Sequence, residues 1–133
     1  MSDAWKWVLA ALTAMGVFLF GGMDGLLISL IVLIVLDYVT GVVAAALRHE
    51  LSSEVGARGI AKKVFMLAIV AVANIVDVCV VGEGHVLRTV VVIFYISNEG
   101  ISLLDNGGRM VVPLPDKLLQ VLKQLKDNSS NTK

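Results

Sequence analysis

The sequence has little of what enzymes and disulfide-bonded domains are built from. Its single cysteine, Cys79, cannot form a disulfide within the chain and lies in an apolar run typical of a small packed side chain. His49 and His85 stand alone in expected loops, and Ser52-Ser53 has no plausible histidine base and fits a turn or helix cap. The sequence also has no Gly-rich phosphate loop and no metal-ligand spacing. We therefore expect no enzyme, no cofactor, no metal and no nucleic-acid partner.

Charged and aromatic side chains are also scarce. They make up 17% and 6% of the 133 residues, whereas 57% are hydrophobic and the mean hydropathy is +0.85. A soluble domain is usually about 45–50% apolar. The composition therefore excludes an ordinary soluble domain and predicts an all-α integral membrane protein with one membrane domain, residues 1–133. No Ala-x-Ala cleavage site follows the first apolar segment, so we expect that segment to remain in the mature chain.

The most apolar stretch, residues 26–47, is the segment around which the chain is organised. At about 1.5 Å per residue it is long enough to cross a bilayer core of roughly 30 Å. Asp37 lies at its midpoint, where an ionised carboxylate costs about 2.5–3.5 kcal/mol. Thr40, Gly41 and the alanines that follow share a helical face with Asp37. This face can pack tightly against another helix or turn towards water.

Three further apolar segments complete the expected topology. The first is short for a span, so three spans remain possible, but four are preferred. The expected spans cover residues 7–23, 26–47, 64–81 and 89–105, and a tail covers residues 109–133. Trp5 and Trp7 beside Lys6 are typical of an interfacial anchor.

The distribution of lysine and arginine predicts the orientation of the chain. The one substantial polar loop, residues 48–63, carries Arg48, Arg58, Lys62 and Lys63. With four spans this loop lies on the same side as both termini, and only Arg88 lies on the other side. Basic loops stay in the cytoplasm. We therefore expect a multi-pass membrane protein with a cytoplasmic C-terminus and, with four spans, a cytoplasmic N-terminus. If the first segment does not span, the N-terminus lies outside and the rest of the topology is unchanged.

Each of the last three spans carries polar residues that a bilayer does not tolerate unpaired. The candidate pore or packing residues are Asp37, Thr40, Gly41, Asn74, Asp77, Asn98, Glu99, Ser102 and Asp105. Tyr95, Glu99, Ser102 and Asn106 form one stripe at helical spacing, with Asn98 and Asp105 beside it. Such stripes either hydrogen-bond inside a closed bundle or line water in a larger ring. Their occurrence on three helices favours a water-lined or reorganising assembly.

The end of the chain is predicted to form a short basic amphipathic helix. The only two prolines, Pro113 and Pro115, break the chain before it. Leucines and a valine gather on one face, and Lys117, Lys123 and Lys126 are expected to lie on the membrane surface. The alternative is a helix that packs against the cytoplasmic loop or a neighbouring subunit.

Several blocks of the sequence resemble the holin family of phage lysis and toxin secretion, specifically phage holin family 4. The blocks are Asp37-Tyr38-Val39-Thr40-Gly41, Ser52-Ser53 with residues 58–63, Ile75-Val76-Asp77, residues 94–106 and the step at Pro113 and Pro115. The resemblance covers roughly residues 26–125. Asp105 stands where glutamate is more usual, which preserves the charge.

The resemblance implies a small membrane protein that accumulates in the cytoplasmic membrane and then oligomerises into lesions. Its partners would be other copies of itself, the lipid bilayer, and a cell-wall hydrolase (endolysin) or toxin that leaves the cytosol through the lesions.

Two other classes fit parts of the sequence. A small oligomeric ion channel or proton-coupled transporter would use Asp37 or Glu99 as a cation site, but the carboxyls are dispersed over three helices. A passive membrane scaffold would recruit a partner through residues 48–63 or the tail, but it would leave three intramembrane carboxyls without a role.

Overall fold

The computed structural model describes residues 2–131, which are almost entirely helical. The elements are α1 (Ala4–Phe20), α2 (Gly25–Leu47), α3 (Ser53–Ile75), η1 (Val76–Val81, a π-helix that continues α3), α4 (Val86–Arg109) and α5 (Asp116–Ser130). No strand occurs within the described residues. Met1 and residues 132–133, the end of the predicted tail, lie outside them. The prediction of an all-α protein is confirmed.

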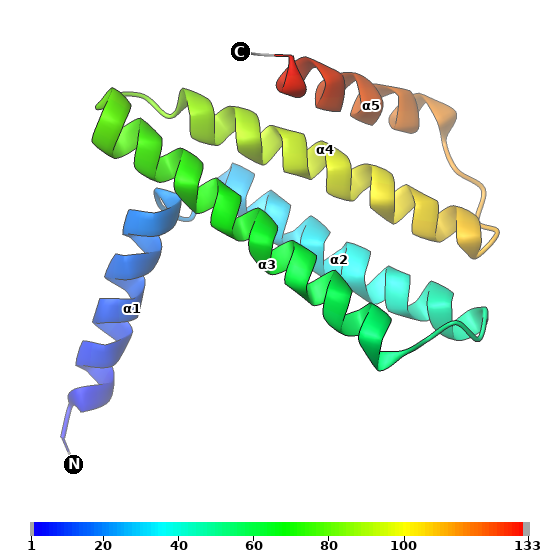
Figure 1. The fold of residues 1–133 in the computed structure, drawn as a ribbon, viewed down its shortest axis with the longest axis horizontal. Coiled ribbons are helices and arrows are strands. Elements are labelled where there is room, and N and C mark those ends of the chain that lie inside the picture. The colour runs from blue at the N-terminus through cyan, green and yellow to red at the C-terminus, as the bar shows by residue number, and fades with distance from the viewer. Residues whose placement is uncertain (1, 132–133) are drawn as a thin grey trace.

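Three helices form the bundle. Figure 1 shows α2, α3 and α4 packed together, with α5 along α4 and α1 projecting away from the bundle. Three segments are long and apolar enough to cross a membrane: Gly25–Leu47, Ser53–Val81 and Val86–Arg109. The remaining apolar helix, α1, has 17 residues, none of them buried. The chain is therefore a multi-pass membrane protein, and whether α1 also spans stays a prediction.

The boundaries of the helices follow from local capping. Gly21 ends α1 in the left-handed conformation at φ 77°, and its N–H donates to the carbonyl of Val17. The Asp24 carboxylate then accepts from the Leu27 N–H at 2.9 Å and starts α2. The α4 helix is capped differently. Its N-cap residue, His85, makes no side-chain cap, and Asp77 accepts from the Leu87 and Arg88 N–H groups at 3.2 and 2.7 Å instead.

The prediction of a loop over residues 48–63 is wrong from Ser53 onward. Ser52 accepts from the Val55 N–H at 3.1 Å, and α3 runs continuously from there. Glu54 and Arg58 pair at 2.9 Å one turn apart, which stabilises the exposed first turns. The loop prediction assumes that all the basic residues of this segment face water. Lys63 does not, because α3 places it between α2 and α4.

A small apolar core lies between α2, α3 and α4 on the side of the bundle near the α2 N-terminus. Leu27, Leu30, Val70 and Val92 form it, and each is at most 2% exposed. Large apolar side chains also cover the outer faces of α2 and α3, among them Val35, Val39, Val43, Val64, Phe65 and Val72. An exposed apolar surface of this extent is expected where lipid is the solvent.

Candidate functional site

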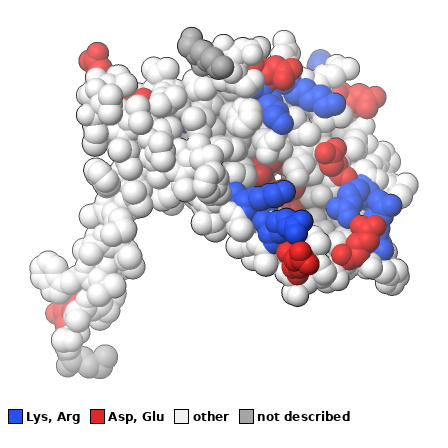
Figure 2. Space-filling model, in the orientation of Figure 1, with Lys and Arg blue, Asp and Glu red and all other residues white. Residues whose placement is uncertain are grey.

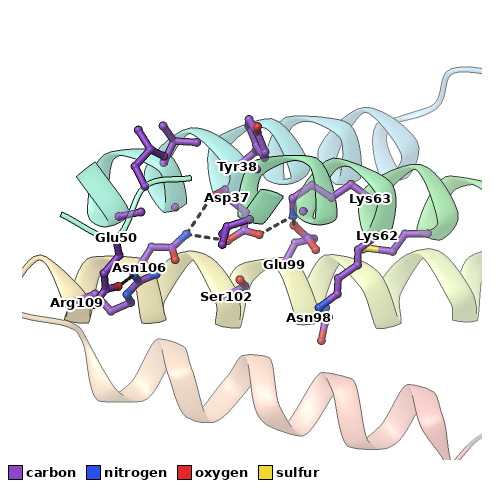
Figure 3. Close-up of a pocket in the computed structure, with 18 residues that line it drawn as sticks. Asp37, Tyr38, Glu50, Lys62, Lys63, Asn98, Glu99, Ser102, Asn106 and Arg109 are labelled. Carbon is purple, nitrogen blue, oxygen red and sulfur yellow. Dashed lines mark hydrogen bonds and ion pairs between the residues drawn. The ribbon is translucent and has the colours of Figure 1, made fainter. Parts of the chain in front are cut away.

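A lysine joins all three helices of the bundle at a buried ion triad. The Nζ of Lys63 on α3 lies 2.6 Å from the Oδ2 of Asp37 on α2 and 2.6 Å from the Oε2 of Glu99 on α4. Figure 3 shows the three side chains converging in the gap between their helices. Their side chains are 14%, 9% and 3% exposed, in the same order. Charges placed this deep require partners, and here each has one within hydrogen-bond distance.

Asn106 holds the second oxygen of Asp37. Its Nδ2 donates to the Asp37 Oδ1, to the Asp37 carbonyl and to the Thr40 Oγ1, all at 2.9 Å. The Thr40 hydroxyl in turn donates to the Leu36 carbonyl at 2.8 Å. The two carboxylate oxygens of Asp37 are therefore held by different helices, one by Lys63 and one by Asn106.

A cavity of about 460 Å³ extends from the triad towards the ends of α2 and α4. At that end the Arg109 Nη2 and the Glu50 Oε2 pair at 3.0 Å. The wall also carries the small or polar residues Gly41, Gly56, Gly59, Lys62, Asn98 and Ser102 and the apolar residues Val42, Leu51, Val55 and Met66. Lys62, Asn98 and Ser102 are labelled in Figure 3. Water entering the cavity would thus reach the triad without crossing the apolar core.

A second polar cluster lies at the opposite end of the bundle. The guanidinium of Arg88, a residue only 2% exposed, donates to both Asp24 carboxylate oxygens at 2.8 and 3.1 Å and to the carbonyls of Phe20 and Gly22. The Arg88 hydrogen bond, followed by that from the Leu27 N–H, lowers the pKa of Asp24 below its ordinary value. Arg88 therefore ties the end of α1 and the start of α2 to α4.

Asn74 ties α1 to α3 in the same cluster. Its Nδ2 donates to the Phe18 carbonyl at 2.8 Å, whereas its Oδ1 is buried and has no hydrogen-bond partner within the described structure. Gly21 lies against this oxygen, and a Cβ at that position would be 2.5 Å from it. The close approach explains why the left-handed turn carries glycine here.

The predicted intramembrane residues separate into several environments. Asp37, Thr40 and Glu99 belong to the triad and its hydrogen bonds, whereas Asn74 and Asp77 belong to the opposite cluster. Asn98 accepts from the Lys126 Nζ of α5 at 3.0 Å. Gly41 and Ser102 line the cavity, and Asp105 is exposed. The three stripes thus do not meet in one place.

The basic residues of the predicted loop and tail also fall into two groups, those exposed on the surface and those in contact with other helices. Arg48 and Arg58 form exposed ion pairs with Glu50 and Glu54, Lys62 is exposed, and Lys63 enters the triad. In the tail, Lys117 and Lys123 are exposed. Lys126 instead bonds to Asn98 and lies 5.7 Å from the centre of the Phe94 ring.

The sequence reasoning missed three functional candidates: Lys63 as a triad member, and the Arg88–Asp24 pair. A signal for Lys63 exists, because the polar stripe through Asn74 continues at helical steps through Val70 and Met66 to Lys63. The signal for Arg88 is weaker. In the four-span topology it is the single basic residue on the side of the membrane where the turn with Asp24 lies.

The chemistry of the triad is that of a polar contact between helices. Two carboxyls share one ammonium, so the triad carries one negative charge in excess when both are ionised. No group of three His, Cys, Asp or Glu side chains suited to a metal ion occurs within residues 2–131. What the arrangement can do is hold three helices together while it is dry, and hydrate as a unit when they separate.

Comparison with known proteins identifies related sequences. Residues 14–127 match the sequence model of the bacteriophage holin family. An uncharacterised 14.9 kDa protein of Clostridium perfringens is 43% identical over 120 residues, covering 90% of this chain and 91% of the relative. An uncharacterised protein of Halalkalibacterium halodurans is 40% identical over 129 residues, covering 94% and 96%. A protein of Bacillus phage phi105 named "probable holin" is 34% identical over 104 residues, covering 77% and 76%. No solved structure matches significantly.

Proposed function

Because the chain belongs to the bacteriophage holin family, we propose that it acts as a holin: it oligomerises in the bacterial cytoplasmic membrane and opens lesions. Through these lesions an endolysin or a toxin leaves the cytosol, which produces timed lysis or secretion. The proposal assigns no catalysis to the chain. Its partners are other copies of itself, the bilayer and the exported protein. The charge distribution supports cytoplasmic termini: in the four-span topology nine of the eleven lysines and arginines fall on their side, Lys63 lies in the triad, and only Arg88 lies on the other side.

The observation that carries the proposal is the triad of Asp37, Lys63 and Glu99 inside three apolar helices. Each charged group is stabilised in the dry bundle only while the other helices stay in place. A shift of one helix leaves a charge without its partner, and such a loss costs about 3–5 kcal/mol when no water reaches it. The triad therefore favours two arrangements, one closed and dry and one opened and hydrated, over intermediate ones.

The packing of the bundle does not favour a path for water through the interior of a single chain. Between the triad and the Arg88 cluster, the space is filled by Leu27, Leu30, Val70 and Val92, which are 0–2% exposed. The apolar faces of α2 and α3 are available to other copies. We infer that the aqueous path forms between chains, as expected of a lesion and not of a channel or transporter with its pathway inside the monomer.

The test is lysis in bacteria that carry the protein together with a cytosolic wall hydrolase. Turbidity and hydrolase activity in the medium are recorded with and without an uncoupler, and cells without the hydrolase serve as the control. We expect abrupt lysis that requires the hydrolase and comes earlier with the uncoupler. Ion leakage while the hydrolase stays inside would overturn the holin proposal in favour of a channel or transporter. No permeability change would favour a scaffold.

A further inference from the structure

The helix α5 is docked tightly on α4. The Leu122 side chain lies over Gly100, where a Cβ would be 3.0 Å from its Cδ1, and Leu114, just before α5, lies over Gly107. The Lys126 Nζ closes the contact with its bond to Asn98. These contacts place α5 alongside the half of α4 that ends at Arg109 (Figure 1).

The side of α5 that faces away from α4 is polar. The half-buried positions are Leu119, Leu122, Lys126 and Ser129, which share one helical face. The opposite face carries the exposed residues Lys117, Gln120, Lys123, Gln124 and Asp127. Between them runs a short exposed apolar stripe of Leu118, Val121 and Leu125.

This polar face lies at the same depth as a candidate membrane span. Asn98 is near the middle of Val86–Arg109, so Lys126 places α5 beside the half of that span that ends at Arg109. The same half of α4 contacts α2 through Asn106 and Asp37, and there α2 exposes Val39 and Val43. The bundle is therefore apolar on its α2 side and polar on its α5 side at one depth. Figure 2 shows charged side chains gathered at one end of the visible face, whereas α1 is mostly white.

We propose that α5 docks once chains assemble, while the triad is still closed as in this structure, and that its polar face lines the water of the lesion after the triad opens. This inference rests on the proposed holin function. Around a dispersed chain, lipid would surround the docked α5, and charged side chains are costly in hydrocarbon. In that state α5 leaves α4 and lies on the membrane surface, where its lysines meet anionic headgroups. Assembly supplies water beside α4, and α5 docks.

The test uses cross-linking of α5 to α4 in the full-length chain. Cys79→Ser removes the native thiol, and Gly100→Cys with Leu122→Cys places two thiols at the tight contact. The matched control combines Leu122→Cys with Gly16→Cys on the projecting helix α1, where nothing lies within 4 Å. The purified variants are reconstituted into vesicles at low and high protein density, oxidised and scored for intrachain disulfide. Release of an entrapped dye is recorded on the same samples.

We expect the Gly100–Leu122 pair to cross-link several-fold more in vesicles that release dye than in vesicles that do not, and the control pair to stay low in both. Oxidation after release should leave the lesions open, because α5 stays docked in them. Equal cross-linking at both densities, or dye release without cross-linking, would overturn the inference and leave the holin function standing. Absence of release at every density would overturn the function, and the inference with it.

A second measurement covers the case in which the double variant fails to fold. A polarity-sensitive fluorophore is attached through Gln124→Cys on the polar face of α5, and Val17→Cys on the exposed helix α1 is the matched control. Quencher-bearing lipids should stop quenching the probe on α5 once dye is released, and should quench the probe on α1 throughout. Undiminished quenching of the α5 probe in leaking vesicles would contradict the inference.

Discussion

The Nζ of Lys63 lies 2.6 Å from the Oε2 of Glu99, although the two residues are 36 positions apart and the sequence predicts a loop for the first and a span for the second. The same ammonium also holds Asp37. Because it bridges the other two helices, Lys63 is the residue whose removal most directly separates them.

Lys63→Met should destabilise the bundle strongly. The substitution leaves two buried carboxyls without their ammonium, and breaking a buried ion pair in this way costs about 3–5 kcal/mol. The free energy of unfolding in detergent measures the loss. The matched control is Lys62→Met, the exposed neighbour, which should change stability by no more than about 0.5 kcal/mol. Equal stability of the two variants would contradict the role given to the triad.

Glu99→Gln should delay lysis. The amide oxygen still accepts from Lys63, but the excess negative charge is gone, so the dry bundle becomes more stable relative to the hydrated one. The time between induction and the fall in turbidity measures the effect. Asp105→Asn, an exposed carboxylate on the same helix, provides the comparison and should lyse on the wild-type schedule. An identical onset for both variants would argue against hydration of the triad as the switch.

Gly21→Ala should cost more stability than Gly22→Ala. Both glycines have a positive φ, at 77° and 102°, so both substitutions are strained. Only at Gly21 would the new Cβ clash with the Asn74 Oδ1, at 2.5 Å, whereas nothing lies within 4 Å at Gly22. The free energies of unfolding should differ by about 1–3 kcal/mol, because the clash separates Asn74 from its bond to the α1 carbonyl. Equal losses would mean that α1 is not held at this point.

Arg88→Lys should loosen the connection between α1 and α2. A lysine cannot reproduce the fork that holds both oxygens of Asp24 and two backbone carbonyls. Amide hydrogen exchange should rise over residues 18–27, with Arg48→Lys, in an exposed pair, as the control that leaves this region unchanged. Unaltered exchange after Arg88→Lys would contradict the proposed tie.

The Arg88–Asp24 pair should resist mild acid. Because its bonds to Arg88 hold the pKa of Asp24 below the model-compound value of 3.8, the pair's contribution is complete above that pH and is lost as the pH falls through the lower folded value. The stability difference between wild type and Asp24→Asn should thus be constant from about pH 7 to about pH 5, and shrink only below 3.8. The Asp24 side chain is 50% exposed, so we expect the difference to be about 1 kcal/mol or less. A difference that vanishes near neutral pH would refute the assignment.

Much of the fold could be predicted because it depends on local signals. The apolar run of residues 26–47 is α2 almost to the residue, and the glycine turn at Gly21 and Gly22 separates it from α1. The family resemblance, which rested on short blocks of sequence, is confirmed by the match over residues 14–127. The sequence predicts the third span only from Val64, whereas α3 starts at Ser53, because its charged first turns fit a loop as well as a helix and only the Ser52 cap indicates the earlier start.

The site was predictable only in part, because its pairings are distant in the sequence. Asp37 and Glu99 could be identified as costly charges in apolar spans, but not the fact that one lysine, 26 residues from the first and 36 from the second, serves both. The Arg88 cluster depends in the same way on contacts 64 to 68 residues apart. Periodicity fixes which face a residue occupies, and only the packing of the helices decides which faces meet.

The most direct test of the central claim is the size of what escapes through the protein alone. Purified protein is reconstituted at high density into vesicles that contain a small fluorescent dye together with a folded wall hydrolase, and the release of both is followed. Wild-type protein should release the hydrolase together with the dye, and Lys62→Met should do the same. Escape of the dye while the active hydrolase stays inside would contradict a lesion that exports proteins and would identify the chain as a small channel.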